Sequence, residues 1–108
     1  MNTAVLDAVQ LALSGDTSLA SEHLTELWNE LPPDDFFSRC VIAHYLADLQ
    51  PDPHTELDWD LRALDAALAA SPESFEEQLP NVTREAFLPS LYLNLASSYE
   101  RTHDLDRA

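Results

Sequence analysis

Seven prolines divide this chain into segments of helical length. Proline lacks a backbone N–H and clashes with the preceding turn, so helices end before a proline or begin at one. The prolines are Pro32, Pro33, Pro51, Pro53, Pro72, Pro80 and Pro89. The chain also has a single glycine, Gly15, whereas turn-rich β architectures depend on glycine. Together these features predict an all-α fold, in a chain whose length suits one small domain.

Apolar residues within these segments recur at the three- and four-residue spacing of helices. Residues 3–13 are apolar around most of their circumference and residues 17–31 carry one apolar stripe, which predicts two successive helices. Gly15 can adopt the left-handed conformation that ends the first helix, and Asp16 can cap the second. Further helices are predicted at residues 35–49, 59–70 and 86–102, and a short one at residues 74–79, where Ser74 and Glu77 have the capping-box spacing. Asp58 is the predicted cap of the helix that follows it.

A helix-turn-helix pattern occurs twice, at an offset of 88 residues. The offset aligns Gly15-Asp16 with His103-Asp104, Leu11 with Tyr99, and Ala20 with Ala108. It predicts a tight turn at His103-Asp104 and the start of a further helix beyond that turn.

The repeated pattern resembles the tetratricopeptide repeat, a helical hairpin of about 34 residues. The matching positions are Ala8, Leu11, Gly15, Asp16, Ala20, Leu24 and Pro32 in the first segment, Val41, Tyr45, Leu64, Ala67 and Pro72 in the middle, and Tyr92, Leu95, Ala96, Tyr99 and Ala108 in the last. The chain is also similar to short bacterial tetratricopeptide-like proteins with no assigned activity. The resemblance implies antiparallel helical hairpins stacked as a short right-handed α-solenoid.

One domain over residues 1–108 is implied, with three repeats of unequal completeness. The implied boundaries are residues 1–34 for the first repeat, 35–74 for the second with a long internal turn at 50–58, 75–88 for a connector, and 89–108 for an incomplete third repeat. Because the last repeat stops early in its second helix, we expect either a longer native chain or another segment that covers its first helix.

Acidic residues number 20 against five basic ones, all of them arginine, which gives a net charge of −15. This balance argues against binding to nucleic acid or to an anionic membrane, since both need clustered positive charge. The negative charge fits either a basic partner or an ordinary solvated surface, in a protein whose source has generally acidic proteins. No signal-peptide pattern opens the chain and Cys40 is its only cysteine, so we expect a cytoplasmic location.

In the family, the first helices of successive hairpins form a concave groove that binds peptides. Carried onto this chain, the resemblance implies a groove lined by Val5, Val9, Leu13, Arg39, Ala43, Leu46, Leu93, Asn94, Ser97 and Arg101. This groove is mostly apolar, so we expect a protein or peptide partner that is apolar with basic flanks. The stripe formed by Tyr92, Leu95 and Tyr99 is expected in the core.

Two other functional classes remain open. The same face could pair with its twin, which would make the protein a self-associating homo-oligomer. Cys40, His44 and Asp48 follow one another at four-residue intervals on one helix face, a pattern that could serve a metal carrier or enzyme. A fourth ligand is not evident, and the sequence has no phosphate-binding loop or nucleophile elbow, so we predict no metal, cofactor or catalytic residue.

Overall fold

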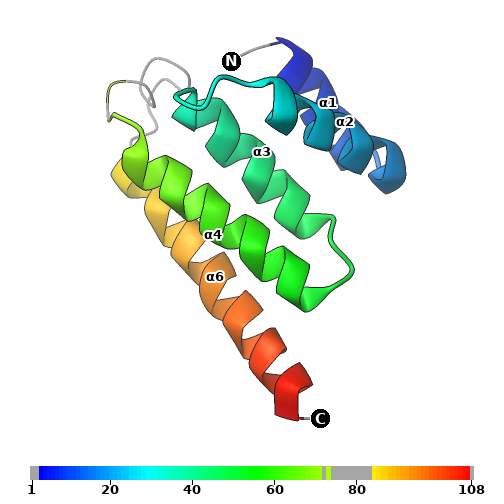
Figure 1. Ribbon diagram of the computed structural model, residues 1–108, viewed down its shortest axis with the longest axis vertical. Helices are drawn as coiled ribbons and strands as arrows, with labels where there is room; N and C mark the ends of the chain where they lie inside the picture. Colours follow the sequence, from blue (N-terminus) through cyan, green and yellow to red (C-terminus); the bar gives the residue numbers. More distant parts are fainter. Residues whose placement is uncertain (1–2, 72, 74–83, 108) are drawn as a thin grey trace.

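The computed structural model describes residues 3–71, 73 and 84–107, and every element in this part is an α-helix (Figure 1). This confirms the all-α class predicted from the prolines. The helices are α1 (Thr3–Leu13), α2 (Thr17–Glu30), α3 (Phe36–Asp48), α4 (Pro53–Ala69) and α6 (Arg84–Arg107).

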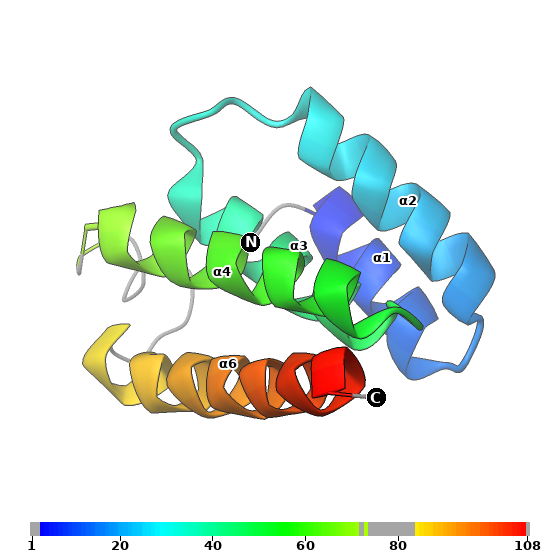
Figure 2. The same ribbon diagram turned by 60° about the horizontal axis from the view of Figure 1, so that its bottom comes forward.

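The helices are arranged as successive antiparallel neighbours. Helices α1 and α2 form one pair, α3 and α4 form a second pair, and α6 packs along α4 (Figures 1 and 2). Helix α3 contacts α1, α2 and α4, so it is the central helix. The C-terminal turns of α6 extend past the N-terminal end of α4 (Figure 1).

The turn between α1 and α2 has the predicted chemistry. Gly15 adopts a φ of 96°, in the left-handed region, where a helix commonly ends. The Asp16 carboxylate then accepts a hydrogen bond from the Leu19 N–H at 3.4 Å and caps α2. Asp35 caps α3 in the same way, through the N–H of Ser38.

One apolar core lies between the two helix pairs. Helix α3 supplies its centre, because Cys40, Ile42, Ala43 and Leu46 are all fully buried. Val5 from α1 and Leu24 from α2 pack on one side, and Ala63, Leu64 and Ala67 from α4 pack on the other. A helix with neighbours on several sides needs apolar residues around most of its circumference, as α3 has.

The predicted long turn at residues 50–58 is wrong. Helix α4 already begins at Pro53, and its cap is Asp52, whose carboxylate accepts a hydrogen bond from the Thr55 N–H at 3.1 Å. Proline suits the first position of a helix because its missing N–H would have no partner there. Asp58 therefore lies within α4 and does not cap it.

The predicted turn at His103-Asp104 is also wrong, because α6 continues through both residues to Arg107. Neither residue has the conformational freedom of glycine that ends α1 at Gly15. Pro89 lies inside α6, beyond its first turn. The predicted short helix at residues 74–79 lies outside the described residues.

Candidate interaction surfaces

The ten residues expected to line one groove are distributed over the core and several separate surfaces. Val5, Ala43 and Leu46 are fully buried, so they belong to the core and do not line an open groove. Leu13 on α1 and Leu93 on α6 are each 72% exposed. The other five residues line three different pockets.

The first surface is an apolar pocket of about 210 Å³ between α1, α3 and α6. We call it the apolar pocket; it is lined by Leu6, Val9, Phe37, Val41, His44, Tyr45 and Phe87. The His44 ring packs edge-on against Tyr45 and Phe87, with centroid distances of 5.3 and 6.2 Å. Val9 is the one expected groove residue in this pocket.

This pocket lies between α1, α3 and α6, the three segments that were expected to line the groove, but the residues of α3 that line it differ from those expected. Phe37, Val41 and Tyr45 line it, whereas Arg39 and Ala43 were expected. Successive positions of a helix point about 100° apart, so an error of one or two residues selects a different face.

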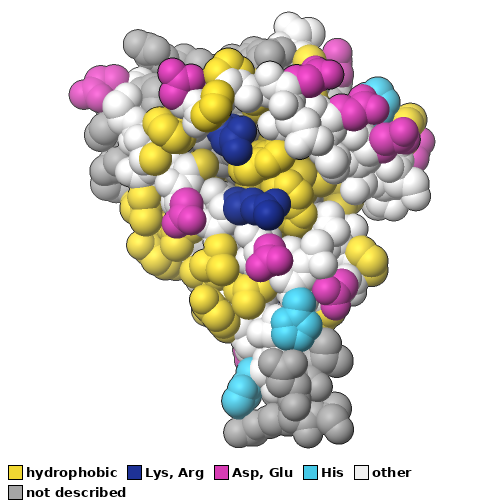
Figure 3. Space-filling view, in the orientation of Figure 1, with side chains coloured by type: hydrophobic (Ala, Val, Ile, Leu, Met, Phe, Trp, Pro, Cys, Tyr) yellow, Lys and Arg dark blue, Asp and Glu magenta, His cyan; other side chains and the backbone are white. Residues whose placement is uncertain are grey.

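The second surface is a groove of about 310 Å³ between α2, α3 and α4. It is lined by Trp28, Phe36, Arg39, Arg62, Asp65, Ala66 and Ala69, and Trp59 packs directly beside it. We call it the Trp-Arg groove. In Figure 3, arginine side chains lie within a hydrophobic area on the face that the view shows.

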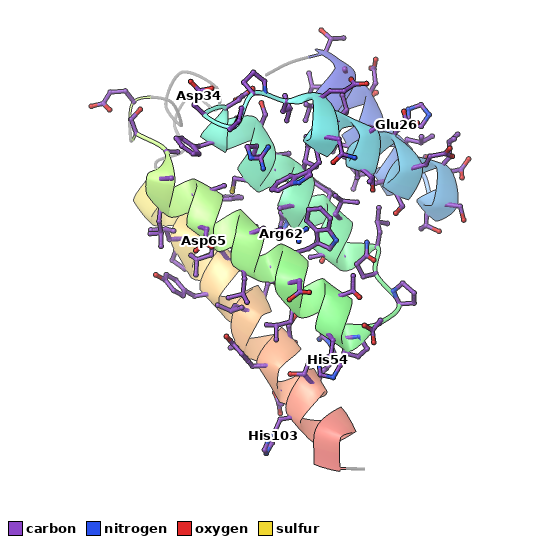
Figure 4. All side chains as sticks on the ribbon, in the orientation of Figure 1. Glu26, Asp34, His54, Arg62, Asp65 and His103 are labelled. Atoms are coloured by element: carbon purple, nitrogen blue, oxygen red, sulfur yellow. The ribbon has the colours of Figure 1, made fainter. Side chains whose placement is uncertain are left out.

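The two tryptophans and two arginines of this groove form one cluster of contacts. The Trp28 and Trp59 rings meet edge to face, with centroids 5.0 Å apart and planes at 89°. The Arg39 guanidinium lies over Trp28 at 3.9 Å from its centroid, and that of Arg62 lies over Trp59 at 4.4 Å. Figure 4 shows Arg62 extending from α4 toward the space between α4 and α2. Each contact has the geometry of a cation–π interaction.

Sequence reasoning missed this cluster except for Arg39. Its tryptophans are 31 positions apart, on helices that do not follow one another, so no local pattern pairs them. The sequence did contain one signal for this cluster. The chain has only five basic residues, and both Arg39 and Arg62 follow an aromatic residue within three positions.

A polar pocket of about 160 Å³ lies between α3, α4 and α6. Its lining includes three expected groove residues, Asn94, Ser97 and Arg101, together with Asp48, Glu56 and Asp60. Arg101 forms an ion pair with Glu56 at 2.5 Å and donates a hydrogen bond to the Ser97 hydroxyl at 2.7 Å. Asn94 is hydrogen-bonded to His44 at 3.4 Å. These side chains largely satisfy one another, which indicates a role in joining the helices.

Asp60 is the most deeply buried carboxylate of this pocket. Desolvation by burial raises the pKa of Asp60, and the negative charges of Glu56 and Asp48 raise it further. The hydrogen bond that Ser98 donates to the carboxylate lowers the pKa and only partly opposes this rise.

The metal alternative gains no support from the side chains that the structure describes. Cys40 lies in the core, His44 lines the apolar pocket, and Asp48 lines the polar pocket. Burial raises the pKa of the Cys40 thiol to about 12, which disfavours the thiolate that binds metals. No three or more His, Cys, Asp or Glu side chains come together as a metal site in the described part of the chain.

The exposed side of α6 differs from the expectation for its aromatic stripe. Leu95 packs against the core as expected, but Tyr92 and Tyr99 are 50% and 51% exposed. Helix α6 turns Leu91 and Ser98 toward α4 instead, and both are almost fully buried. Tyr92, Leu93 and Tyr99 therefore form an exposed apolar face, which we call the α6 face.

Comparisons with protein-family models, with curated proteins and with solved structures give no match for this chain. Among the described helices, none combines the length and the apolar character needed to cross a membrane.

Proposed function

We propose that this protein is an interaction module that binds an apolar segment of a partner protein in the apolar pocket. The supporting observation is that residues from α1, α3 and α6 converge on one apolar opening. At about 210 Å³ the pocket is smaller than the roughly 300–1,000 Å³ of typical small-molecule sites. It suits one or two apolar side chains of a peptide or helix.

The proposal includes a tetratricopeptide-like arrangement of the helices. The antiparallel α1–α2 and α3–α4 pairs, with α6 beside α4, support this arrangement. In it, α1, α3 and α6 are the first helices of successive hairpins, which carry the peptide site in the family. Basic residues on either side of the apolar segment would complement a chain of net charge −15.

A displayed library of random twelve-residue peptides tests the proposal, with the purified protein as bait. Peptides with an apolar centre and basic flanks should be enriched, and Val9→Glu should weaken their binding at least tenfold, because it adds a charge to an apolar lining. Leu93→Glu is the matched control, since it makes the same kind of change on the α6 face, outside the pocket. Circular dichroism should show that both variants fold. Equal binding to wild type and Val9→Glu would overturn the assignment.

Self-association is a second candidate, favoured by the exposure of Tyr92, Leu93 and Tyr99. Contiguous apolar surface of this kind often marks an interface. Light scattering at two protein concentrations tests it, because a homo-oligomer formed through the α6 face should grow with concentration. Leu93→Glu should then return the mass to that of a monomer, and a constant monomer mass for the wild type would exclude this candidate.

A further inference from the structure

We propose that the Trp-Arg groove is a second binding surface, which captures the carboxylates of an acidic peptide segment that also carries an apolar side chain. This surface is separate from the apolar pocket. Phe36 and Arg39 project from one side of α3 into the groove, whereas Phe37 and Val41 project from another side into the pocket. The central helix thus presents two surfaces of different chemistry.

The guanidinium groups of the groove are positioned but not paired. Within residues 3–71, 73 and 86–103, neither Arg39 nor Arg62 forms an ion pair or donates a side-chain hydrogen bond; their contacts are with the tryptophan rings. Arg101, by contrast, is paired with Glu56. Because no side-chain hydrogen bond in this part of the chain uses them, the N–H donors of both guanidiniums are available to a ligand. The planar fork of a guanidinium matches a carboxylate, which can accept two parallel hydrogen bonds.

Both arginines lie near the ring of Trp28. The Arg39 guanidinium lies 3.9 Å from the Trp28 centroid, and that of Arg62 lies 6.0 Å from the same centroid. Two cations therefore share one ring. A carboxylate bound beside this ring would accept hydrogen bonds from arginines of α3 and α4, and its charge would offset their positive charges.

The charge of the rest of the molecule limits how acidic the ligand can be. The chain carries a net charge of −15, and Asp65 lines the groove itself. A polyanion such as a nucleic acid would extend over this negative surface and be repelled. A peptide with one or two carboxylates matches the two guanidiniums and extends little beyond them.

The apolar walls of the groove are the reason that we expect an apolar side chain in the ligand. Trp28, Phe36, Ala66 and Ala69 line it beside the arginines. A leucine or aromatic side chain next to the carboxylates would pack against this apolar wall. Tryptophan and arginine are the residues that most often dominate binding energy in protein interfaces.

The same displayed library tests this inference separately from the proposed function. Wild-type protein should enrich a second class of peptides, with Asp or Glu beside an apolar residue. The double variant Arg39→Gln/Arg62→Gln should lose the acidic peptides and still bind the peptides with an apolar centre and basic flanks. Val9→Glu should lose the peptides with basic flanks and still bind the acidic ones. Undiminished recovery of acidic peptides by the double variant, or no acidic enrichment by the wild type, would overturn the inference and leave the apolar pocket unaffected.

Isothermal titration calorimetry with an acidic peptide from the selection then measures its affinity for the protein. Replacing its Asp and Glu residues by Asn and Gln should weaken binding about tenfold or more, which corresponds to about 1.4 kcal/mol. In the protein, Asp65→Asn should strengthen binding a few fold, since it removes a like charge from the groove. Glu26→Gln removes the same charge from an exposed position of α2 outside the groove and should leave the affinity unchanged.

Asp65→Asn keeps the test decisive if the arginine variants disturb the tryptophan cluster, because Asp65 is exposed and its replacement leaves the cluster intact. Equal affinities of Asp65→Asn and wild type would contradict the inference. Displacement of the peptide by millimolar inorganic phosphate would identify a phosphate site instead. A concentration-dependent dimer that the arginine substitutions dissociate would identify a second copy of the chain as the occupant, and either result would overturn the assignment to a peptide.

Discussion

The Ser98 hydroxyl on α6 donates a hydrogen bond to the carboxylate of Asp60 on α4, and both side chains are buried. The guanidinium of Arg101 extends this contact, because it donates to the Ser98 hydroxyl at 3.2 Å and pairs with Glu56 at 2.5 Å. A buried carboxylate is costly unless it is hydrogen-bonded. The Asp60–Ser98 contact therefore specifies how α6 docks on α4, alongside the apolar contact of Leu91.

Ser98→Ala should lower the free energy of unfolding by about 1–3 kcal/mol, because it leaves the buried Asp60 carboxylate without its hydroxyl donor. Urea denaturation followed by circular dichroism measures the change. Ser90→Ala, at an exposed position of the same helix, is the control and should change stability by less than about 0.5 kcal/mol. Similar losses for the two variants would show that the hydrogen bond contributes little.

Asp60 should make stability depend on pH. Its pKa in the folded protein is raised by burial, so the folded state binds a proton that the unfolded state releases at its ordinary pKa of about 3.9. Stability contributed by this group is therefore present below the unfolded pKa and is lost as the pH rises through the folded pKa. Asp60→Asn removes this loss, so the variant should gain stability relative to wild type between pH 4 and pH 7.

Urea denaturation of wild type and Asp60→Asn at the two pH values checks this direction. Asp58→Asn, an exposed position on α4, controls for the loss of one negative charge from the helix. A stability difference between wild type and Asp60→Asn that stays constant from pH 4 to pH 7 would contradict the role of burial.

Features encoded within a few residues could be predicted from the sequence. Gly15 and Asp16 predicted both the end of α1 and the cap of α2, because a left-handed glycine and an N-cap act locally. The sequence also predicted the all-α class. The start of α4 was missed because the Asp52-Pro53 pair was interpreted as part of a turn, although it is a favourable helix start.

Features that depend on distant residues could not be predicted. Asp60 and Ser98 are 38 positions apart, and their contact sets which side of α6 faces α4. Once Ser98 faces inward, Tyr92 and Tyr99 face outward, although their spacing alone fits a core stripe. The Trp28–Trp59 contact likewise depends on how two non-consecutive helices pack across α3.

Cys40 should be unreactive in the folded protein. It is fully buried and its pKa is raised to about 12, so at pH 8 almost no thiolate forms. Alkylation by iodoacetamide, followed by mass spectrometry, should be more than about a hundredfold slower in the native protein than in urea. Ser90→Cys adds an exposed thiol to the same molecule as an internal reference. Equal alkylation rates for the two cysteines would show that the core opens readily.

Gly15→Ala should destabilise the protein by about 1–2 kcal/mol, the usual cost of holding a residue with a Cβ in the left-handed conformation. The φ of Gly15 is 96°, and a Cβ added there meets no atom within 4 Å, so the expected loss arises from the backbone and not from a clash. Gly15→Asn should lose less stability, because asparagine tolerates this conformation better.

Ser18→Ala, exposed on α2, is the control for an added alanine in the same region. Thermal or urea denaturation should rank the proteins with wild type most stable, Gly15→Asn next and Gly15→Ala last. A Gly15→Ala variant as stable as wild type would show that the α1–α2 turn can reform without a left-handed residue, and the two helices would then be held together by their packing alone.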